Sequence, residues 1–230
     1  PEICGRICPQ DRLCEGNCVV EKGFESVTIG AVEKFITETA FEKGWIKPIR
    51  PPRERSQSVG IIGAGPAGLA AASQLRRRGY QVHVYDRYDR SGGLLIYGIP
   101  NFKLEKDVVQ RRHALLAEGD ITFHLNFDVG RDATLAELRN RHDALLIATG
   151  VYKQRDIAAP GSGLRNIHQA LDYLTASNRQ GLGDSVPAFA DGSLNAAGKD
   201  VVVIGGGDTA MDCVRTAVRQ QADRVYCVYR

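Results

Sequence analysis

Four of the six cysteines lie close together near the start of the chain, at Cys4, Cys8, Cys14 and Cys18. Thiols grouped in this way can form disulfides, hold structural zinc or ligate an iron–sulfur cluster. Disulfides are typical of small secreted domains, and the sequence shows no secretory signal. Zinc sites usually repeat close cysteine pairs at longer range, whereas the spacing here is C-x3-C-x5-C-x3-C with a proline after the second cysteine. The spacing alone modestly favours an iron–sulfur cluster and leaves zinc open.

A glycine-rich segment follows a short apolar strand, which we predict at residues 59–62 and expect to be buried. The glycines of its G-x-G-x-x-G motif are Gly63, Gly65 and Gly68. A helix is predicted at residues 69–78, capped by Gly79, and a strand at residues 81–86 ends in Asp86. In dinucleotide-binding units these glycines allow a tight turn, approach of a pyrophosphate and close helix packing, while the acid binds a ribose. The complete order makes a chance glycine turn the weaker interpretation.

Two further glycine features follow this unit. Gly92 and Gly93 come shortly after Asp86, and a buried strand predicted from Ala144 ends in Ala-Thr-Gly at Gly150. Both features are typical of flavoproteins that bind FAD on this fold. The paired glycines could equally form only a turn.

The pattern recurs after a second apolar strand, predicted to be buried at residues 200–204. Its G-x-G-x-x-A motif consists of Gly205, Gly207 and Ala210. A helix through Arg219 is predicted to lead to a strand at residues 224–229, and Arg230 stands where the first unit has Asp86. A cation there accommodates the 2′-phosphate of NADP, whereas an acid favours a free ribose hydroxyl. The first unit therefore suits FAD and the second suits NADPH.

These elements predict an α/β chain with two Rossmann-like units. We expect a cysteine-rich helical Fe–S region at residues 1–46, a Pro/Arg-rich linker at 47–58, an FAD-binding domain at 59–155 and the start of an NADPH-binding domain at 156–230. An amphipathic helix over residues 28–42, with Thr28 as its N-cap and Gly44 after its end, is expected to cover the cysteine loops. The chain starts without Met and the second unit has only two strands, so we expect a piece of a longer protein.

Composition excludes several classes of protein. The 230 residues are 43% hydrophobic and 25% charged, which is typical of globular domains and not of disordered chains. No apolar run approaches the roughly 20 residues of a membrane span. The linker segment 47–55 accounts for the net charge of +3, so we expect no basic face for nucleic acid. Reduced thiols and the missing signal lead us to expect a cytoplasmic protein.

We expect no catalytic acid or base on this chain. The histidines are scattered along the sequence, and none is spaced from a cysteine or carboxylate as in a metal site or triad; they are His83, His113, His124, His142 and His168. Cys213 is expected to pack as a small apolar residue. No C-x-x-C pair lies near the first glycine motif, which argues against a dithiol-shuttling reductase.

Three longer stretches carry a family resemblance: residues 4–18, 97–104 and 205–212. With the order cysteines, linker, FAD-type motif and NADPH-type motif, the whole chain resembles the small (β) subunits of bacterial NADPH-dependent glutamate synthases. The same module is similar to the N-terminal half of dihydropyrimidine dehydrogenase and to NADPH-binding subunits of ferredoxin-linked reductases. Residues 147–153 and 172–178 look most like glutamate synthase.

The resemblance implies two [4Fe–4S] clusters, FAD and NADPH. Cys8 and Cys14 would ligate one cluster and Cys18 the other, Glu33 matches a non-cysteine ligand, and Cys4 belongs to the motif with a weaker claim to be a ligand. The positions matched to FAD are Gly63, Ala64, Gly65, Pro66, Ala67, Gly68, Asp86, Gly93, Leu94, Lys103, Val129, Thr149 and Gly150. The positions matched to NADPH are Gly205, Gly206, Gly207, Asp208, Thr209, Ala210 and Arg230. Further cluster ligands would lie upstream of this chain.

The implied function is electron transfer from NADPH through FAD and the clusters to a large FMN- and Fe–S-containing subunit that forms glutamate from glutamine and 2-oxoglutarate. One rival is the same module serving a pyrimidine- or ferredoxin-reducing partner. Another is a zinc-stapled nucleotide-binding interaction module without redox activity. Gln221 departs from the family, which usually has glycine after the second helix, so a left-handed cap there would cost about 1 kcal/mol.

Overall fold

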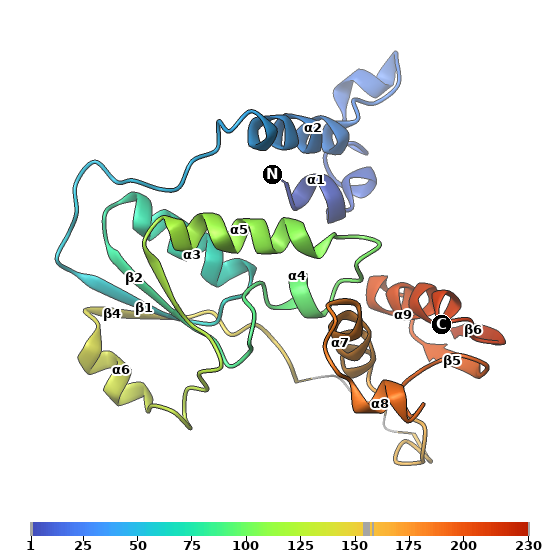
Figure 1. The fold of residues 1–230 in the computed structure, drawn as a ribbon. Coiled ribbons are helices and arrows are strands. Elements are labelled where there is room, and N and C mark those ends of the chain that lie inside the picture. Colours follow the sequence, from blue (N-terminus) through green and yellow to red (C-terminus); the bar gives the residue numbers. More distant parts are fainter. Residues whose placement is uncertain (1, 154–156, 158, 230) are drawn as a thin grey trace.

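The chain forms two separate parallel sheets flanked by helices, and the computed structural model describes residues 2–153, 157 and 159–229 (Figure 1). The first sheet has the order β3-β2-β1-β4, with β1 (Ser58–Ile62), β2 (Gln81–Tyr85), β3 (Ile121–His124) and β4 (Ala144–Ile147). The second sheet pairs β5 (Asp200–Ile204) with β6 (Arg224–Val228). The helices are α1 (Cys4–Ile7), α2 (Ile29–Glu42), α3 (Pro66–Arg77), α4 (Leu94–Tyr97), α5 (Lys106–Glu118), α6 (Leu135–Arg141), α7 (Ala170–Gly181), α8 (Pro187–Ala190) and α9 (Asp208–Arg219), with 3-10 turns at Gln10–Arg12 and Val19–Lys22. The predicted α/β class is confirmed.

The centre of the first sheet is buried on both faces. Ile61 on β1 and Val84 on β2 are fully buried against α3 and α5, in a core that also holds Leu69 and Leu116. On the opposite face, Leu138 of α6 packs with the sheet residues Ile62 and Tyr85. Near-continuous apolar strands are expected for a parallel sheet covered on both sides. The edge of this sheet at the ends of β1 and β2 is where the glycine loop and Asp86 lie.

Two strands predicted to be buried are exposed instead. β4 is the last strand in the order of the first sheet, and Ile147 at its end is 61% exposed. In β5, Val202 and Ile204 are 59% and 66% exposed. An apolar run identifies a strand, but burial depends on which elements cover it, and within the described residues β5 pairs only with β6.

The cysteine region and the linker are held against the first sheet's helices. α2 matches the predicted helix, Gly44 follows it with φ +63°, and α1 packs on α2 where Gly5 meets the backbone at Gly30. The prediction that α2 covers the cysteine loops holds only in part, because Phe35 is 72% exposed. None of the helices in the described part of the chain combines the length and the apolar character that a membrane span needs.

The linker is held by hydrogen bonds to α3 and to Gly79, which follows it. Glu54 accepts two hydrogen bonds from the guanidinium of Arg76 on α3, at 2.6 and 2.7 Å, and the Arg55 N–H donates to the carbonyl of Gly79. Arg76 itself is buried. The linker therefore helps to define where α2 lies relative to α3.

Candidate nucleotide-binding loops and cysteine region

The first glycine loop, residues 63–68, is shaped by contacts that leave no room for side chains at two of its glycines. Gly63 has φ +110°, and a Cβ there would lie 2.4 Å from the carbonyl oxygen of Ala148. A Cβ on Gly68 would lie 1.9 Å from the carbonyl oxygen of Gly63. Around Gly65, by contrast, a Cβ would meet nothing within 4 Å. Two glycines are thus required for packing, while the third leaves an open approach to the backbone at the N-terminus of α3, where an anion is stabilised.

Asp86 closes the loop from the end of β2. Its carboxylate accepts the backbone N–H of Ala64 at 2.6 Å and the backbone N–H of Tyr88 at 2.9 Å. The sequence predicts an acid near the phosphate loop, and the structure adds that this acid is anchored on the loop itself. A carboxylate held in this way keeps remaining lone pairs for a ribose hydroxyl.

Other residues matched to FAD gather at the same loop. A Cβ on Gly93 would lie 2.9 Å from the Cα of Gly65, and the N–H of Gly92 donates to the carbonyl of Ala64. Thr149 lies behind Gly63, and Gly150 follows with φ +69°. The pair Gly92–Gly93 therefore does more than form a turn, because both glycines are in contact with the loop or with a core side chain.

The other three positions matched to FAD each lie beside a different part of the structure. Leu94 is the first residue of α4, directly after Gly93. Val129 packs with the cluster around Tyr85 on the α6 side of the sheet. Lys103 directs its ammonium group to Asp212 on α9, at 3.0 Å, and so reaches the second nucleotide unit.

The second glycine loop, residues 205–210, is more open than the first. Gly205 has φ +140°, and its N–H donates to the carbonyl of Val228. Gly206 lies against the ring of Tyr229, whereas a Cβ on Gly207 would meet nothing within 4 Å. Asp208, Thr209 and Ala210 form the first turn of α9, with only Ala210 buried. Arg230 lies outside the described residues.

The cysteine region brings together part of the predicted ligand set. All its thiols are free, and Cys8 and Cys18 are partly buried. Burial raises the pKa of the Cys8 thiol, and three nearby groups that can carry negative charge add to the rise: Cys4, Cys14 and Glu33. The Cys18 thiol has a lowered pKa because backbone N–H groups of Val27 and Val20 stabilise its thiolate. Cys8 thus shares its surroundings with Cys4, Cys14 and Glu33, and Cys18 has different ones.

Donor chemistry in this region fits iron–sulfur ligation, because thiolates close in sequence are the ligands such clusters use. Within residues 2–153, 157 and 159–229, however, no three His, Cys, Asp or Glu side chains converge as a complete metal site. The described residues therefore offer a partial ligand set.

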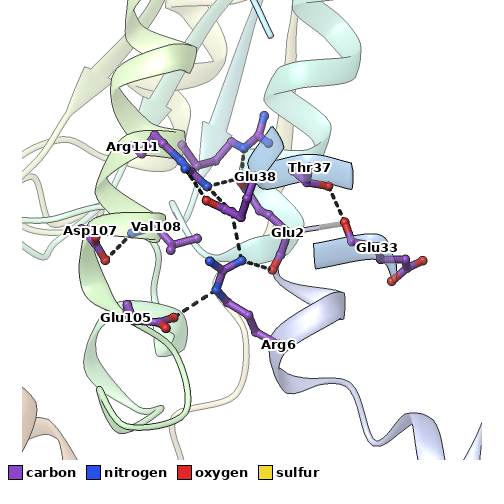
Figure 2. Close-up of polar contacts among 10 residues, drawn as sticks. Glu2, Arg6, Glu33, Thr37, Glu38, Glu105, Asp107, Val108 and Arg111 are labelled. Atoms are coloured by element: carbon purple, nitrogen blue, oxygen red, sulfur yellow. Dashed lines mark hydrogen bonds and ion pairs between the residues drawn. The ribbon is translucent and has the colours of Figure 1, made fainter. Parts of the chain in front are cut away.

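A network of arginines and carboxylates attaches the cysteine region to α5 (Figure 2). Arg111 of α5 binds Glu38 of α2 with both terminal nitrogens, at 2.7 and 2.9 Å, and also reaches the buried Glu2. Arg6 of α1 bridges Glu38 and Glu105. The hydrogen bond from Arg111 lowers the pKa of Glu38 to about 2. These contacts set the position of the cysteines relative to the FAD-type unit.

Three histidines that are scattered in the sequence lie together on the α6 side of the first sheet. His83 Nδ1 and His124 Nε2 are 3.2 Å apart, and His142 hydrogen-bonds to the hydroxyls of Ser58 and Tyr85. Burial lowers the pKa of all three. These contacts are consistent with the predicted structural roles, and they bring together three histidines that are far apart in the sequence.

Sequence reasoning did not identify a cavity of about 380 Å³ beside Asp86. Its walls include Arg87, Tyr88 and Tyr152 from the first unit and Arg179 from α7. The Arg87 guanidinium lies 5.0 Å from the ring centres of both tyrosines. No local pattern predicts this aromatic and cationic wall, because Tyr152 and α7 come from distant parts of the chain.

Two protein families match the chain. Residues 57–230 match the pyridine nucleotide-disulphide oxidoreductase family, and residues 1–45 match the 4Fe–4S cluster domain described as dihydropyrimidine dehydrogenase domain II. Both matches support the predicted set of pyridine nucleotide, flavin and iron–sulfur cofactors.

Curated relatives extend the similarity over the whole chain. The chain is 69% identical over 231 residues to the glutamate synthase [NADPH] small chain of Azospirillum brasilense, and 46% identical over 232 residues to that of Escherichia coli. All of this chain is covered, but only 48% of each relative. The chain thus spans about half the length of these relatives. The predicted resemblance is confirmed.

Among solved structures, FprA of Mycobacterium tuberculosis in complex with NADPH has a similar fold, with a TM-score of 0.63, 23% identity, and coverage of 76% of this chain and 43% of FprA. This likeness supports the fold class. Since the family match covers residues 57–230, including both glycine loops and both sheets, the chain belongs to the pyridine nucleotide-disulphide oxidoreductase family.

Proposed function

We propose that this chain is part of the electron-input subunit of an NADPH-dependent glutamate synthase. In this role electrons pass from NADPH through FAD and [4Fe–4S] clusters to a large FMN- and Fe–S-containing subunit, which forms glutamate from glutamine and 2-oxoglutarate. The proposal rests mainly on the first glycine loop, whose geometry suits a dinucleotide, in a chain 69% identical to a glutamate synthase small chain. A flavin supplies the chemistry needed between a hydride donor and one-electron clusters.

For FAD, the open backbone at Gly65 and the N-terminus of α3 would bind the pyrophosphate. Asp86, anchored on Ala64, would orient the ribose. Gly93 and Thr149 would border the same ligand, because both lie against the loop, and Gly150 directly follows Thr149. Leu94, Lys103 and Val129 remain proposed contacts from the resemblance alone.

For NADPH, the exposed first turn of α9 would bind the second pyrophosphate. Gly207 leaves its backbone accessible there, and residues 208–210 present free N–H groups. Arg230 would recognise the 2′-phosphate. Each loop thus contributes binding and orientation, and no acid–base group is required of this chain.

For the clusters, Cys8, Cys14 and Glu33 would contribute to one site and Cys18 to another, with Cys4 the weakest candidate. The shared surroundings of Cys8, Cys14 and Glu33 support the grouping; Cys4 shares them too and ranks last from the resemblance alone. Remaining ligands would come from other parts of a longer protein, consistent with relatives about twice as long. Reduced thiols suit the cytoplasm, where we place the protein.

The sharpest test of the FAD site is Gly65→Ala in the full-length protein. The new methyl group meets no protein atom within 4 Å, so the thermal unfolding temperature should stay unchanged while bound FAD falls at least about tenfold. Gly23→Ala is the matched control, since that glycine also has open space around it but lies outside both loops. Normal FAD content in Gly65→Ala would contradict the site.

The electron route is tested by removing iron with a chelator from the full-length subunit. NADPH-dependent dye reduction should persist, while glutamate formation with the large subunit should stop. Dependence on a pyrimidine or ferredoxin in place of glutamine and 2-oxoglutarate would favour the first rival. A colourless, zinc-containing preparation would favour the interaction module and contradict the proposal.

A further inference from the structure

We infer that Asp212 of α9 is a positioning residue that couples the two nucleotide-binding units through the segment 97–103, here called the latch. This inference rests on the proposed function for its catalytic consequence. The observation behind it is that Lys103, matched by resemblance to the FAD site, directs its charge to the carboxylate of Asp212 at 3.0 and 3.1 Å.

One face of α9 contacts the latch. Asp212, Arg215 and Arg219 are spaced i, i+3 and i+7, so they lie on the same side of the helix. The guanidinium carbons of Arg215 and Arg219 lie 4.7 and 3.8 Å from the ring centre of Phe102. Asp212 is buried, with its side chain 10% exposed, so the ion pair is largely shielded from water. A shielded ion pair next to a stacked aromatic ring holds a defined geometry.

The other end of the latch is attached to the FAD-type loop. Tyr97 ends α4, and its N–H donates to the carbonyl of Gly93, which itself packs on Gly65. The buried Lys106 donates from Nζ to the carbonyls of Leu95 and Ile99, which ties α4 to the following turn. A continuous set of contacts therefore runs from the first glycine loop to the latch.

α7 supports the latch from the side of the second unit. Buried Asn178 donates to the carbonyl of Tyr97 at 2.9 Å, and Arg179 lies over the Tyr97 ring at 4.6 Å. α7 is also bound to the end of α9, because the Tyr173 hydroxyl donates to Gln220, the residue that directly follows α9, at 2.8 Å. The latch thus lies between α4 on one side and the α7–α9 pair on the other.

Asp212 lies five residues after Gly207, on the helix whose first turn would bind NADPH. A shift of α9 relative to α4 would therefore change the distance between the two cofactors without altering either binding loop. Misplacement by about 1 Å can reduce a transfer rate about 100-fold. The coupling should accordingly appear in the rate of flavin reduction and not in nucleotide affinity.

The test compares Asp212→Asn with Asp212→Glu and Asp200→Asn in the full-length, FAD-containing protein. Asp212→Asn removes the charge at constant shape, and Asp212→Glu keeps the carboxylate. Asp200→Asn is the control, because the Asp200–Arg224 pair is exposed and lies within the second sheet. Hydrogen exchange of residues 97–103 without nucleotide measures the mobility of the latch, and anaerobic stopped-flow reduction by NADPH measures the consequence for flavin reduction.

For Asp212→Asn we expect about tenfold faster exchange in the latch and a limiting flavin-reduction rate about 10- to 100-fold lower. The apparent NADPH dissociation constant should change less than about threefold, and FAD content should stay normal. Asp212→Glu should retain most of both properties. Unchanged exchange, or a reduction rate equal to that of Asp200→Asn, would overturn the inference. Wild-type flavin that NADPH fails to reduce would overturn the proposed function, while the exchange comparison would still decide the latch.

Discussion

The two glycine loops have the same sequence pattern but differ in what packs against them. In the first, Gly63 and Gly68 are buried, with backbone carbonyls where side chains would be, and Asp86 binds the loop. In the second, Gly206 and Gly207 are exposed, and Ala210 replaces the third glycine. Within the described residues, the first loop is therefore enclosed by its own sheet and helices, whereas the middle of the second loop is open.

Exchanging the third position of the motif should give the largest difference between the loops. Gly68→Ala places a methyl group 1.9 Å from a backbone oxygen, and we expect a loss of about 2–3 kcal/mol in the free energy of unfolding together with loss of FAD. Ala210→Gly should cost only about 1 kcal/mol, the usual price of glycine in a helix. Urea unfolding and FAD content of the full-length protein measure both. Equal destabilisation by the two variants would contradict the comparison.

Removing the anchor of the first loop should have the next largest effect. Asp86→Ala leaves the N–H groups of Ala64 and Tyr88 without their acceptor, so we expect about 2 kcal/mol of destabilisation and weaker FAD binding. Asp143→Ala is the control, because Asp143 also accepts a backbone N–H, that of Ser58, at an exposed site away from the loop. FAD titration of apoprotein distinguishes them: equal affinity in both variants would exclude a role for Asp86.

Acid should destabilise the first sheet before the second. His83, His124 and His142 have lowered pKa values in the folded state, mainly through burial, so the unfolded state binds more protons as the pH falls below about 6.5. Stability conferred by these neutral histidines is therefore present at higher pH and decreases as the pH falls through that region. Strands β5 and β6 contain no histidine.

Charged and hydrogen-bonding groups near these histidines also influence their protonation. Arg141 opposes the protonation of His124 and His142, and Asp143 favours that of His142. The Tyr85 and Ser58 hydroxyls hydrogen-bond to His142. Hydrogen exchange of β2 and β5 at pH 7.5 and 5.5 measures each sheet separately. His124→Phe should reduce the acid sensitivity of β2, and the exposed His168→Phe should not. Equal sensitivity of both sheets would contradict the prediction.

The C-terminal cap of α9, compared with that of α3, should give the smallest effect on stability. α3 is followed by Gly79 at φ +87°, whereas α9 is followed by Gln221 at φ +63°, which confirms the left-handed position expected from the sequence. Gln221→Gly should stabilise the second unit by about 1 kcal/mol, because a side chain is strained in this region. Thermal unfolding measures it. Gly79→Ala should destabilise by more than this, because its Cβ would also lie 1.9 Å from the carbonyl oxygen of Arg53. A loss of stability in Gln221→Gly would show that the cap is not strained.

Much of the geometry of the two glycine loops could be predicted, because glycine positions depend on local backbone conformation. Gly63 needs a positive φ and Gly68 needs contact with the strand, and both requirements follow from a strand turning into a helix. Strand burial could not be predicted in the same way. The apolar runs of β4 and β5 resemble that of β1, but Ile147 and Val202 are exposed because no described element covers them.

By itself, the sequence determined the order of the elements, the two glycine turns and the grouping of the cysteines, since each depends on residues close together in the chain. Only the tertiary structure decided that His83, His124 and His142 meet, that Arg111 joins α5 to the cysteine region, and that Lys103 pairs with Asp212, 109 residues away. Such contacts depend on how whole helices and sheets pack. The type of a residue and its spacing from its neighbours in the sequence do not indicate which distant residue the fold will place beside it.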